Sequence, residues 1–264
     1  MFSLEIRIRS TDIKGRPLGW FMMIISRAKK FVMFLPWKTA SQTMVLRLEP
    51  FNESPYSAFF YFNSYLHRVV HQHLTCAEFV CLPESRLGYF MASFVRNPYD
   101  RVYSGFHQLQ KDIREQPRCE YPNAWIRDLV MRQLTDNFSQ LCQAGFQFDR
   151  WLALVGDEQI HDIGRNSNFP LHPSHYWTHV AEQQTVDFVG RVERFEPDFQ
   201  EFLSRVGVAP MEPRNANVVN LEGASASNPF GYRYLDRMNS RSIDRINRLF
   251  ERDFDIFGYE RVAT

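Results

Sequence analysis

The sequence predicts an α/β domain in which a central parallel sheet is flanked by helices, and two strand–loop–helix segments are the main reason. Phe31 to Leu35 is a continuous apolar run with aromatic and β-branched members, which is typical of a strand buried on both faces. Tyr89 to Val95 is a second run of this kind. A helix start signal follows each run within a few residues, and a strand that leads into a helix is the repeating unit of parallel sheets.

Length and composition set the outer limits. With 264 residues, 44% of them hydrophobic and 15% aromatic, the chain can bury one sizeable core, which predicts a single domain over residues 1–264. The net charge of +1 gives no bulk electrostatic reason to expect nucleic acid as a partner. The four cysteines lack metal-ligand spacing, so we expect reduced thiols and no metal. They are Cys76, Cys81, Cys119 and Cys142.

The loop after the first apolar run has the features of an anion site. Thr39 reads as a helix N-cap with Gln42 three residues later, so a capping box is predicted to open a helix. A helix start presents unpaired N–H groups and the positive end of its dipole, and Lys38 lies in the same loop beside the hydroxyls of Ser41 and Thr43. The alternative interpretation is a solvated loop lysine among ordinary turn residues.

The second segment carries a similar signal. Asn97 is a predicted N-cap and Pro98 occupies the first helical position. At about 100° per residue, Asn97, Arg101 and Ser104 share one face of the helix, and Arg96 lies at the strand end just before it. This geometry predicts that a cation and a hydroxyl point into one crevice.

Together, the two segments resemble the donor-binding motifs of sulfotransferases that use 3'-phosphoadenosine 5'-phosphosulfate (PAPS). In that family the first motif holds the 5'-phosphosulfate, and the second, with Pro two residues after Arg, holds the 3'-phosphate. The resemblance is to the carbohydrate and heparan-type membrane-bound branch and its bacterial relatives, and it extends to Val186–Phe199 and Asp253–Glu260. It implies that the donor is held by Lys38, Thr39, Ala40, Ser41, Gln42, Thr43, Arg96 and Ser104.

The resemblance also implies a P-loop-like three-layer fold, with a core over about residues 31–260 and variable acceptor-binding helices over about 107–180. The expected reaction is in-line transfer of a sulfuryl group to an acceptor hydroxyl, with a carbohydrate as the expected acceptor. The first motif departs from the family pattern in three places. Trp37 stands where the family usually has Pro, and Ala40 and Gln42 replace the more usual Gly and Ser or Thr.

A general base is needed because an alcohol is a poor nucleophile until its proton is removed, and neutral imidazole suits that role near pH 7. In the resembling branch the base is a histidine followed by small residues and a Glu. His73, with Glu78 after it, fits this pattern, and His71 and His73 resemble the paired histidines of the heparan 2-O type. Glu193 is an alternative base, or a residue that anchors the end of a strand.

Two other functions remain open. A P-loop kinase or other NTPase shares the fold, but no glycines precede Lys38 in a G-x-x-x-x-G-K pattern. The non-enzyme alternative is a nucleotide- or glycan-binding module that has lost catalysis, for which the altered Trp37 and Gln42 leave room.

The rest of the chain contributes expectations about structure and location. Leu4 to Ile8 suits an edge strand, and Gly19 to Ile25 is too short for a membrane span, which needs about 20 apolar residues. A cytoplasmic protein of the bacterial type is therefore expected, and the Golgi lumen only if an anchor has been removed. Thr185 to Val192 reads as a third strand, and Phe195 to Val206 and Ser242 to Phe257 as amphipathic helices.

The segment from Ile163 to His179 has no apolar periodicity and is expected to be a long loop. Its histidines at 172, 175 and 179 have no acid or cysteine in register, so a metal site is not expected there.

Overall fold

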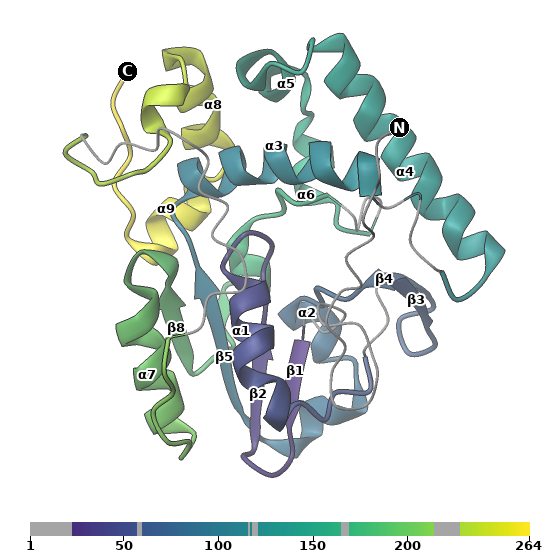
Figure 1. The fold of residues 1–264 in the computed structure, drawn as a ribbon, viewed down its shortest axis with the longest axis vertical. Coiled ribbons are helices and arrows are strands. Elements are labelled where there is room, and N and C mark those ends of the chain that lie inside the picture. Colours follow the sequence, from purple (N-terminus) through teal and green to yellow (C-terminus); the bar gives the residue numbers. More distant parts are fainter. Residues whose placement is uncertain (1–22, 57–59, 116, 118–120, 165–168, 214–227) are drawn as a thin grey trace, which may run out of the picture.

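The computed structural model describes residues 23–56, 60–115, 117, 121–164, 169–213 and 228–264. Its centre is a four-stranded sheet with the order β1-β2-β5-β8 (Figure 1). The strands are β1 (Met23–Ser26), β2 (Phe31–Phe34), β5 (Phe90–Val95) and β8 (Phe188–Arg191). Pairing is parallel between β2 and β5 and between β5 and β8, whereas β1 is antiparallel to β2. The predicted α/β class is confirmed, with β1 as an antiparallel exception to the expected parallel sheet.

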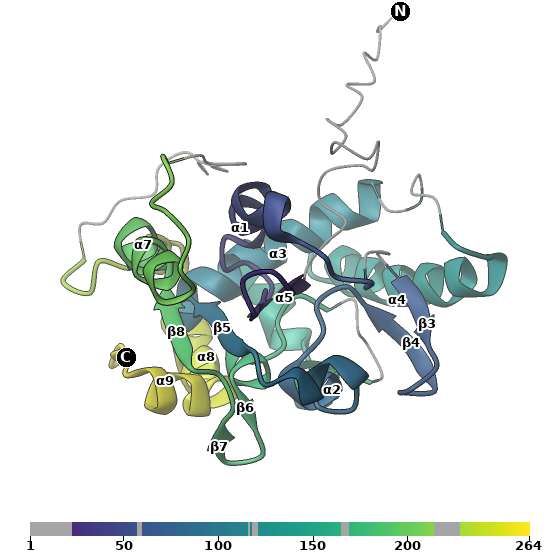
Figure 2. The same cartoon turned by 90° about the horizontal axis from the view of Figure 1, so that it is seen from below.

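Both predicted apolar runs form central strands, and every residue of β2 is buried because structure covers both faces of the sheet. One face is covered by α1 (Ser41–Leu48) and α7 (Phe195–Arg205). Figure 2 shows these two helices on one side of the sheet and α2 (Cys76–Phe79) on the other. The three-layer arrangement follows from the alternation of side chains along each strand, which sends consecutive apolar residues to opposite faces.

The third group of elements packs at the end of the sheet where the parallel strands finish. There α3 (Pro98–Glu115) crosses above the strands (Figure 1). A large apolar cluster joins it to the helices α4 (Ala124–Gln143), α5 (Phe148–Leu154), α8 (Ser240–Leu249) and α9 (Glu251–Phe257). The prediction of a single helix from Ser242 to Phe257 is wrong, because the helix is interrupted at Phe250. Phe250 leaves the helical conformation, with φ −117° and ψ 22°, and its buried ring joins this cluster, so two helices form.

The remaining elements are short. They comprise the hairpin β3 (Phe60–Asn63) and β4 (Arg68–His71), the hairpin β6 (His179–Val180) and β7 (Gln183–Gln184), and helix α6 (Asp157–His161). Short 3₁₀ helices are η1 (Glu49–Phe51), η2 (Pro83–Leu87), η4 (Ser174–Trp177), η5 (Val192–Arg194) and η6 (Leu235–Arg237). The segment expected as one long loop therefore contains η4 and the start of β6.

Two expectations concern residues outside the described ranges, namely the edge strand from Leu4 to Ile8 and the thiol of Cys119. The other cysteines are free thiols, and they are Cys76, Cys81 and Cys142. Within the described ranges, none of the helices combines the length and the apolar character that crossing a bilayer demands.

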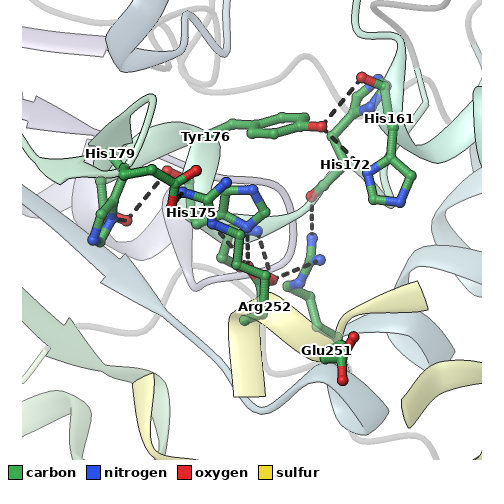
Figure 3. A network of polar contacts seen from close by, with 12 residues as sticks. His161, His172, His175, Tyr176, His179, Glu251 and Arg252 are labelled. Atoms are coloured by element: carbon green, nitrogen blue, oxygen red, sulfur yellow. Dashed lines mark hydrogen bonds and ion pairs between the residues drawn. The ribbon is translucent and has the colours of Figure 1, made fainter. Parts of the chain in front are cut away.

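A buried ion pair ties α3 to α9. Arg101, which has no exposed surface, lies 3.5 Å from Asp253 and donates a hydrogen bond of 2.7 Å to the carbonyl of His172. Asp253 also accepts bonds from the backbone N–H of Ser174 at 2.7 Å and from Nδ1 of His175 at 2.7 Å. Figure 3 shows His172 and His175 in this network. Arg101 therefore stabilises the fold. The sequence placed it on the same helix face as Ser104, but its guanidinium is bound to Asp253 and His172.

We predict that Asp253→Asn lowers the melting temperature by roughly 10 °C at pH 7, because breaking one side of a buried pair costs about 3–5 kcal/mol. Burial alone would raise the pKa of Asp253, but the hydrogen bond from His175 and the charge of Arg101 outweigh it and hold that pKa below 3.8. The stabilisation is therefore present above the unfolded pKa and is lost as the pH falls through the folded one.

Thermal melts of wild type and Asp253→Asn are recorded at pH 7 and at stepwise lower pH. The difference between their melting temperatures should shrink as the pH falls. Asp255→Asn is the matched control, because Asp255 lies on the same helix as Asp253 but its ion pair with Arg261 is exposed, so the melting temperature should change little. A gap that stayed constant with pH would contradict the assigned role of Asp253.

Candidate functional site

The loop between β2 and α1 has an unusual backbone. Lys38 and Ala40 both have left-handed conformations, with φ 63° and φ 60°, and neither is glycine. The buried hydroxyl of Thr39 turns back and donates a bond of 2.9 Å to the carbonyl of Pro36. Loops in which left-handed residues alternate with ordinary ones turn successive backbone N–H groups into one concave surface that suits an anion.

The predicted capping box is wrong. The N-cap of α1 is Ala40, which offers no side-chain hydrogen bond, because the Thr39 hydroxyl is bonded to Pro36. The helix begins one residue later than expected, at Ser41, with Ser41 and Thr43 buried and Gln42 exposed. Ala40 has no side-chain donor or acceptor to cap the helix, and the positive end of the α1 dipole lies at the loop that carries Lys38.

Lys38 reaches from this loop to α3. Its ammonium donates a bond of 2.9 Å to Oε1 of Gln108. Burial lowers the pKa of Lys38 to about 8; the charge of Asp112 opposes this shift, and the charges of Arg96 and Lys111 add to it. Lys38 therefore remains mainly protonated at pH 7 in surroundings that favour an additional negative charge.

The predicted helix start of the second motif is confirmed at the beginning of α3. Oδ1 of Asn97 accepts from the N–H of Asp100 at 2.9 Å, and Pro98 is the first helical residue. Glu193 holds this junction from the neighbouring strand end, accepting from the backbone N–H of Asn97 at 2.8 Å and from the hydroxyl of Tyr259 at 3.1 Å. Both oxygens of Glu193 are thus engaged, as an anchoring role requires.

Arg96 is only loosely paired. Its guanidinium is 3.8 Å from Asp100 and 5.7 Å from the ring centre of Tyr234. Ser104 is partly buried on α3, one helical turn before Gln108, which binds Lys38. The charge of Arg96 also acts on Lys38, so the two residues lie near each other where the parallel strands β2 and β5 end.

Of the paired histidines, His71 is the last residue of β4 and His73 follows it, and both lie beneath Trp37. The Trp37 ring centre is 4.6 Å from that of His71 and 4.2 Å from that of His73, and the two imidazoles stack at 4.9 Å. Nδ1 of His73 forms a short hydrogen bond with the carbonyl of Leu35. A carbonyl only accepts, so Nδ1 carries the proton and Nε2 of neutral His73 carries the lone pair.

Both imidazoles are held neutral. Burial lowers the pKa of His73 to about 3; the bond to the Leu35 carbonyl opposes the shift, and the charge of Lys38 adds to it. The pKa of His71 is also well below its usual value, because of burial and then of the nearby His73 and His172. Nδ1 of His71 accepts a hydrogen bond of 3.3 Å from the backbone N–H of His73, which further ties the pair together.

The sequence model described as "Sulfotransferase family" matches residues 22–260. The chain belongs to the sulfotransferase family. It is 25% identical to carbohydrate sulfotransferase 10 of Gallus gallus over 182 residues, which are 65% of this chain and 47% of that protein. It is also 25% identical to carbohydrate sulfotransferase 10 of Xenopus laevis over 183 residues, which are 65% of this chain and 48% of that protein. The chain thus spans about half the length of these relatives, and no solved structure matches it.

Three residues of the candidate site were not predicted from the sequence. Trp37, which looked like a departure from the family pattern, covers the two histidines. Gln108 binds Lys38, and Asp112 binds Gln108 through a bond of 2.7 Å to Nε2. The spacing of four residues after Ser104 was the available signal, because it places Gln108 and Asp112 on the same helix face.

We predict that Trp37→Ala raises the pKa of His73 toward 6.5, since removing the covering ring lets water reach an imidazole whose pKa is lowered mainly by burial. Titration of the histidine ring carbons by NMR measures the shift. Trp125→Ala, which removes an exposed ring on α4, is the control and should leave the His73 titration unchanged. An unaltered His73 titration in Trp37→Ala would show that the ring does not shield it.

Proposed function

We propose that this protein transfers a sulfuryl group from PAPS to a hydroxyl group of a carbohydrate acceptor. The observation that carries the proposal is that Lys38 and Arg96 lie near each other. Helix α3 begins just after Arg96 and carries Gln108, which accepts a hydrogen bond from Lys38. The family generally uses PAPS, whose phosphosulfate and 3'-phosphate require two separate anion anchors on one surface. Parallel strands ending at one edge provide such a surface.

At the phosphosulfate end, Lys38 and the positive end of the α1 dipole act together. The negative charge that grows on the departing 5'-phosphate is stabilised by a half-buried ammonium and by N–H groups already oriented by the loop. Burial strengthens this attraction because fewer water dipoles screen it. The left-handed residues Lys38 and Ala40 are consistent with this role, since backbone strain is concentrated at functional sites.

At the 3'-phosphate end, Arg96 and Ser104 are the proposed contacts. A guanidinium has five N–H donors in a planar fork, and the 3.8 Å separation from Asp100 leaves donors for a phosphate. Ser104 adds a hydroxyl from the next turns of α3. Because Arg96 lies just before α3 and Ser104 lies on it, the two contacts fix the position of the 3'-phosphate. This in turn orients the 5'-phosphosulfate, which carries the reacting sulfuryl group.

His73 is the proposed general base. Its lone pair is on Nε2, and no described residue donates a hydrogen bond to that atom. His73 removes the acceptor proton as the acceptor oxygen bonds to sulfur and the bond from sulfur to the phosphate oxygen breaks. The negative charge of a bound donor raises the basicity of an imidazole that is otherwise very weakly basic. His71 supports the ring of His73 by stacking.

A carbohydrate acceptor is supported by the names of the two relatives and by an exposed aromatic pair. The rings of Phe62 on the hairpin and Trp125 on α4 are 49% and 51% exposed, with centres 6.1 Å apart. Phe60, on the same strand as Phe62, contacts His71 at 4.7 Å. Aromatic rings that combine exposure with rigidity suit the apolar faces of sugar rings.

The activity is tested with donor labelled in its sulfuryl group and an array of oligosaccharide acceptors, with ATP and Mg²⁺ in parallel. Label transfer to a sugar supports the proposal. Phosphoryl transfer from ATP would favour a kinase, and donor binding without transfer to any acceptor would favour a module without catalysis.

We expect Lys38→Ala to lower kcat by about 10²–10³-fold or more, because it removes a preorganised charge at the leaving group, while donor binding weakens only moderately. Steady-state kinetics and calorimetry with the desulfated nucleotide measure the two effects. Lys30→Ala is the matched control, since Lys30 is exposed and has the same left-handed backbone, with φ 56°, at the opposite end of β2. Wild-type turnover in Lys38→Ala would refute the role of Lys38.

We expect His73→Gln to lower kcat by about 10²–10⁴-fold with little change in nucleotide affinity, because only proton removal is lost. His67→Asn is the control; His67 lies exposed in the hairpin turn at φ 51°, a conformation that asparagine tolerates. If His73→Gln kept its turnover and Glu193→Gln lost it without unfolding, the base would be Glu193.

A further inference from the structure

The polar face of α3 continues beyond Ser104 toward the end of the helix. Gln108 and Asp112 follow at intervals of four residues, so they share that face. Lys38 donates to Oε1 of Gln108 at 2.9 Å, and Nε2 of Gln108 donates to Oδ1 of Asp112 at 2.7 Å. A continuous hydrogen-bonded chain therefore runs from the loop after β2 to the last turn of α3.

The direction of this chain is dictated by its two ends. An ammonium can only donate hydrogen bonds and an ionised carboxylate can only accept them. The Gln108 amide must then turn its NH₂ group to Asp112 and its carbonyl oxygen to Lys38. A neutral residue in place of Asp112 would remove this constraint, and the amide could rotate to present its NH₂ group to the ammonium.

Asp112 lies where a carboxylate is unfavourable for folding. The residue is only 6% exposed, and its Oδ2 has no hydrogen-bond partner among the described residues. It is also in the last turn of α3, where the helix dipole disfavours a negative charge. Burial raises the pKa of Asp112 to about 7, although the bond from Gln108 and the charge of Lys38 oppose the shift. A charge placed at a cost to stability suggests a role in function.

We propose that Gln108 and Asp112 are positioning residues for Lys38: Asp112 fixes the Gln108 amide, and the Gln108 carbonyl oxygen holds the ammonium toward the donor. The assignment of the donor end rests on the proposed function, but the chain of contacts does not. Lys38 has a long flexible side chain, and a fixed acceptor reduces the positions that its ammonium can occupy before the donor binds.

Asp112 also maintains the charge of Lys38. The charged and titratable groups that act on Lys38 or feel its charge are Asp112, Lys111 and His107 on α3, Arg96 before it, and His73 after β4. Of these described groups, only Asp112 can carry a negative charge. It is therefore the group that opposes the loss of the Lys38 proton caused by burial and by the neighbouring cations.

The test compares wild type with Asp112→Asn and Gln108→Met, both close in shape to the original residues. Asp128→Asn is the control, because it removes an exposed carboxylate on α4 that is paired at 3.1 Å with Arg127 and is not among the groups whose charges act on Lys38 or Asp112. The first measurement needs no donor. Trace acetylation of amines across the pH range, read by mass spectrometry on the peptide that contains Lys38, gives the pKa of its ammonium.

We expect Asp112→Asn to shift the Lys38 labelling curve to lower pH by about one unit, and Asp128→Asn to leave it in place. The melting temperature of Asp112→Asn at pH 8 should equal or exceed that of wild type, since a carboxylate whose pKa is raised by folding destabilises the protein above its unfolded pKa. In kinetics, the alkaline limb of kcat should move by the same amount. Gln108→Met should lower kcat about tenfold with little change in donor KM.

An unchanged Lys38 labelling curve in Asp112→Asn, or a lower melting temperature without a shift of that curve, would overturn the assignment of Asp112. A wild-type kcat in Gln108→Met would overturn that of Gln108. If the labelling curve shifts as expected but no acceptor is sulfated by wild type, the effect of Asp112 on Lys38 stands and the proposed function fails.

Discussion

Parallel pairing of β2 with β5, in register from Phe31 opposite Phe90 to Phe34 opposite Ser93, brings the chain that leaves each strand to the same edge of the sheet. Lys38 follows the first strand and Arg96 the second, so two motifs far apart in sequence become neighbours. Every other part of the candidate site is arranged around that edge. The histidines approach it from the hairpin side beneath Trp37, and α3 closes it from above.

Burial has opposite consequences for the cation and the imidazoles at this edge. The same loss of water that lowers the pKa of Lys38 to about 8 lowers that of His73 to about 3. Because their usual values differ by several units, Lys38 stays charged and His73 stays neutral at pH 7. One dry region can therefore hold an electrostatic anchor and a lone pair side by side, which is the combination that proton removal next to an anion requires.

The sequence was informative where the signal is local. The apolar runs that became β2 and β5, the Asn97 cap and the apolar stripe of α7 all depend on residues within one or two turns, and their positions were predicted closely. The conformation of Ala40 could not be predicted, because a non-glycine residue at φ 60° is held there by its surroundings. The same is true of the break at Phe250, which the packing of its ring imposes on a continuous amphipathic pattern.

Helix α3 begins beside Arg96, carries Ser104 in its middle and reaches Lys38 through Gln108. The two ends of the region are thus joined by one regular helix, whose length is set by a constant rise per residue. In the proposed donor complex the helix sets the distance between the two anchors, so an adenosine compound lacking a phosphate at either extremity would leave one cation without its counterpart. Selection among adenine nucleotides in that complex would depend on molecular length, which one regular helix sets.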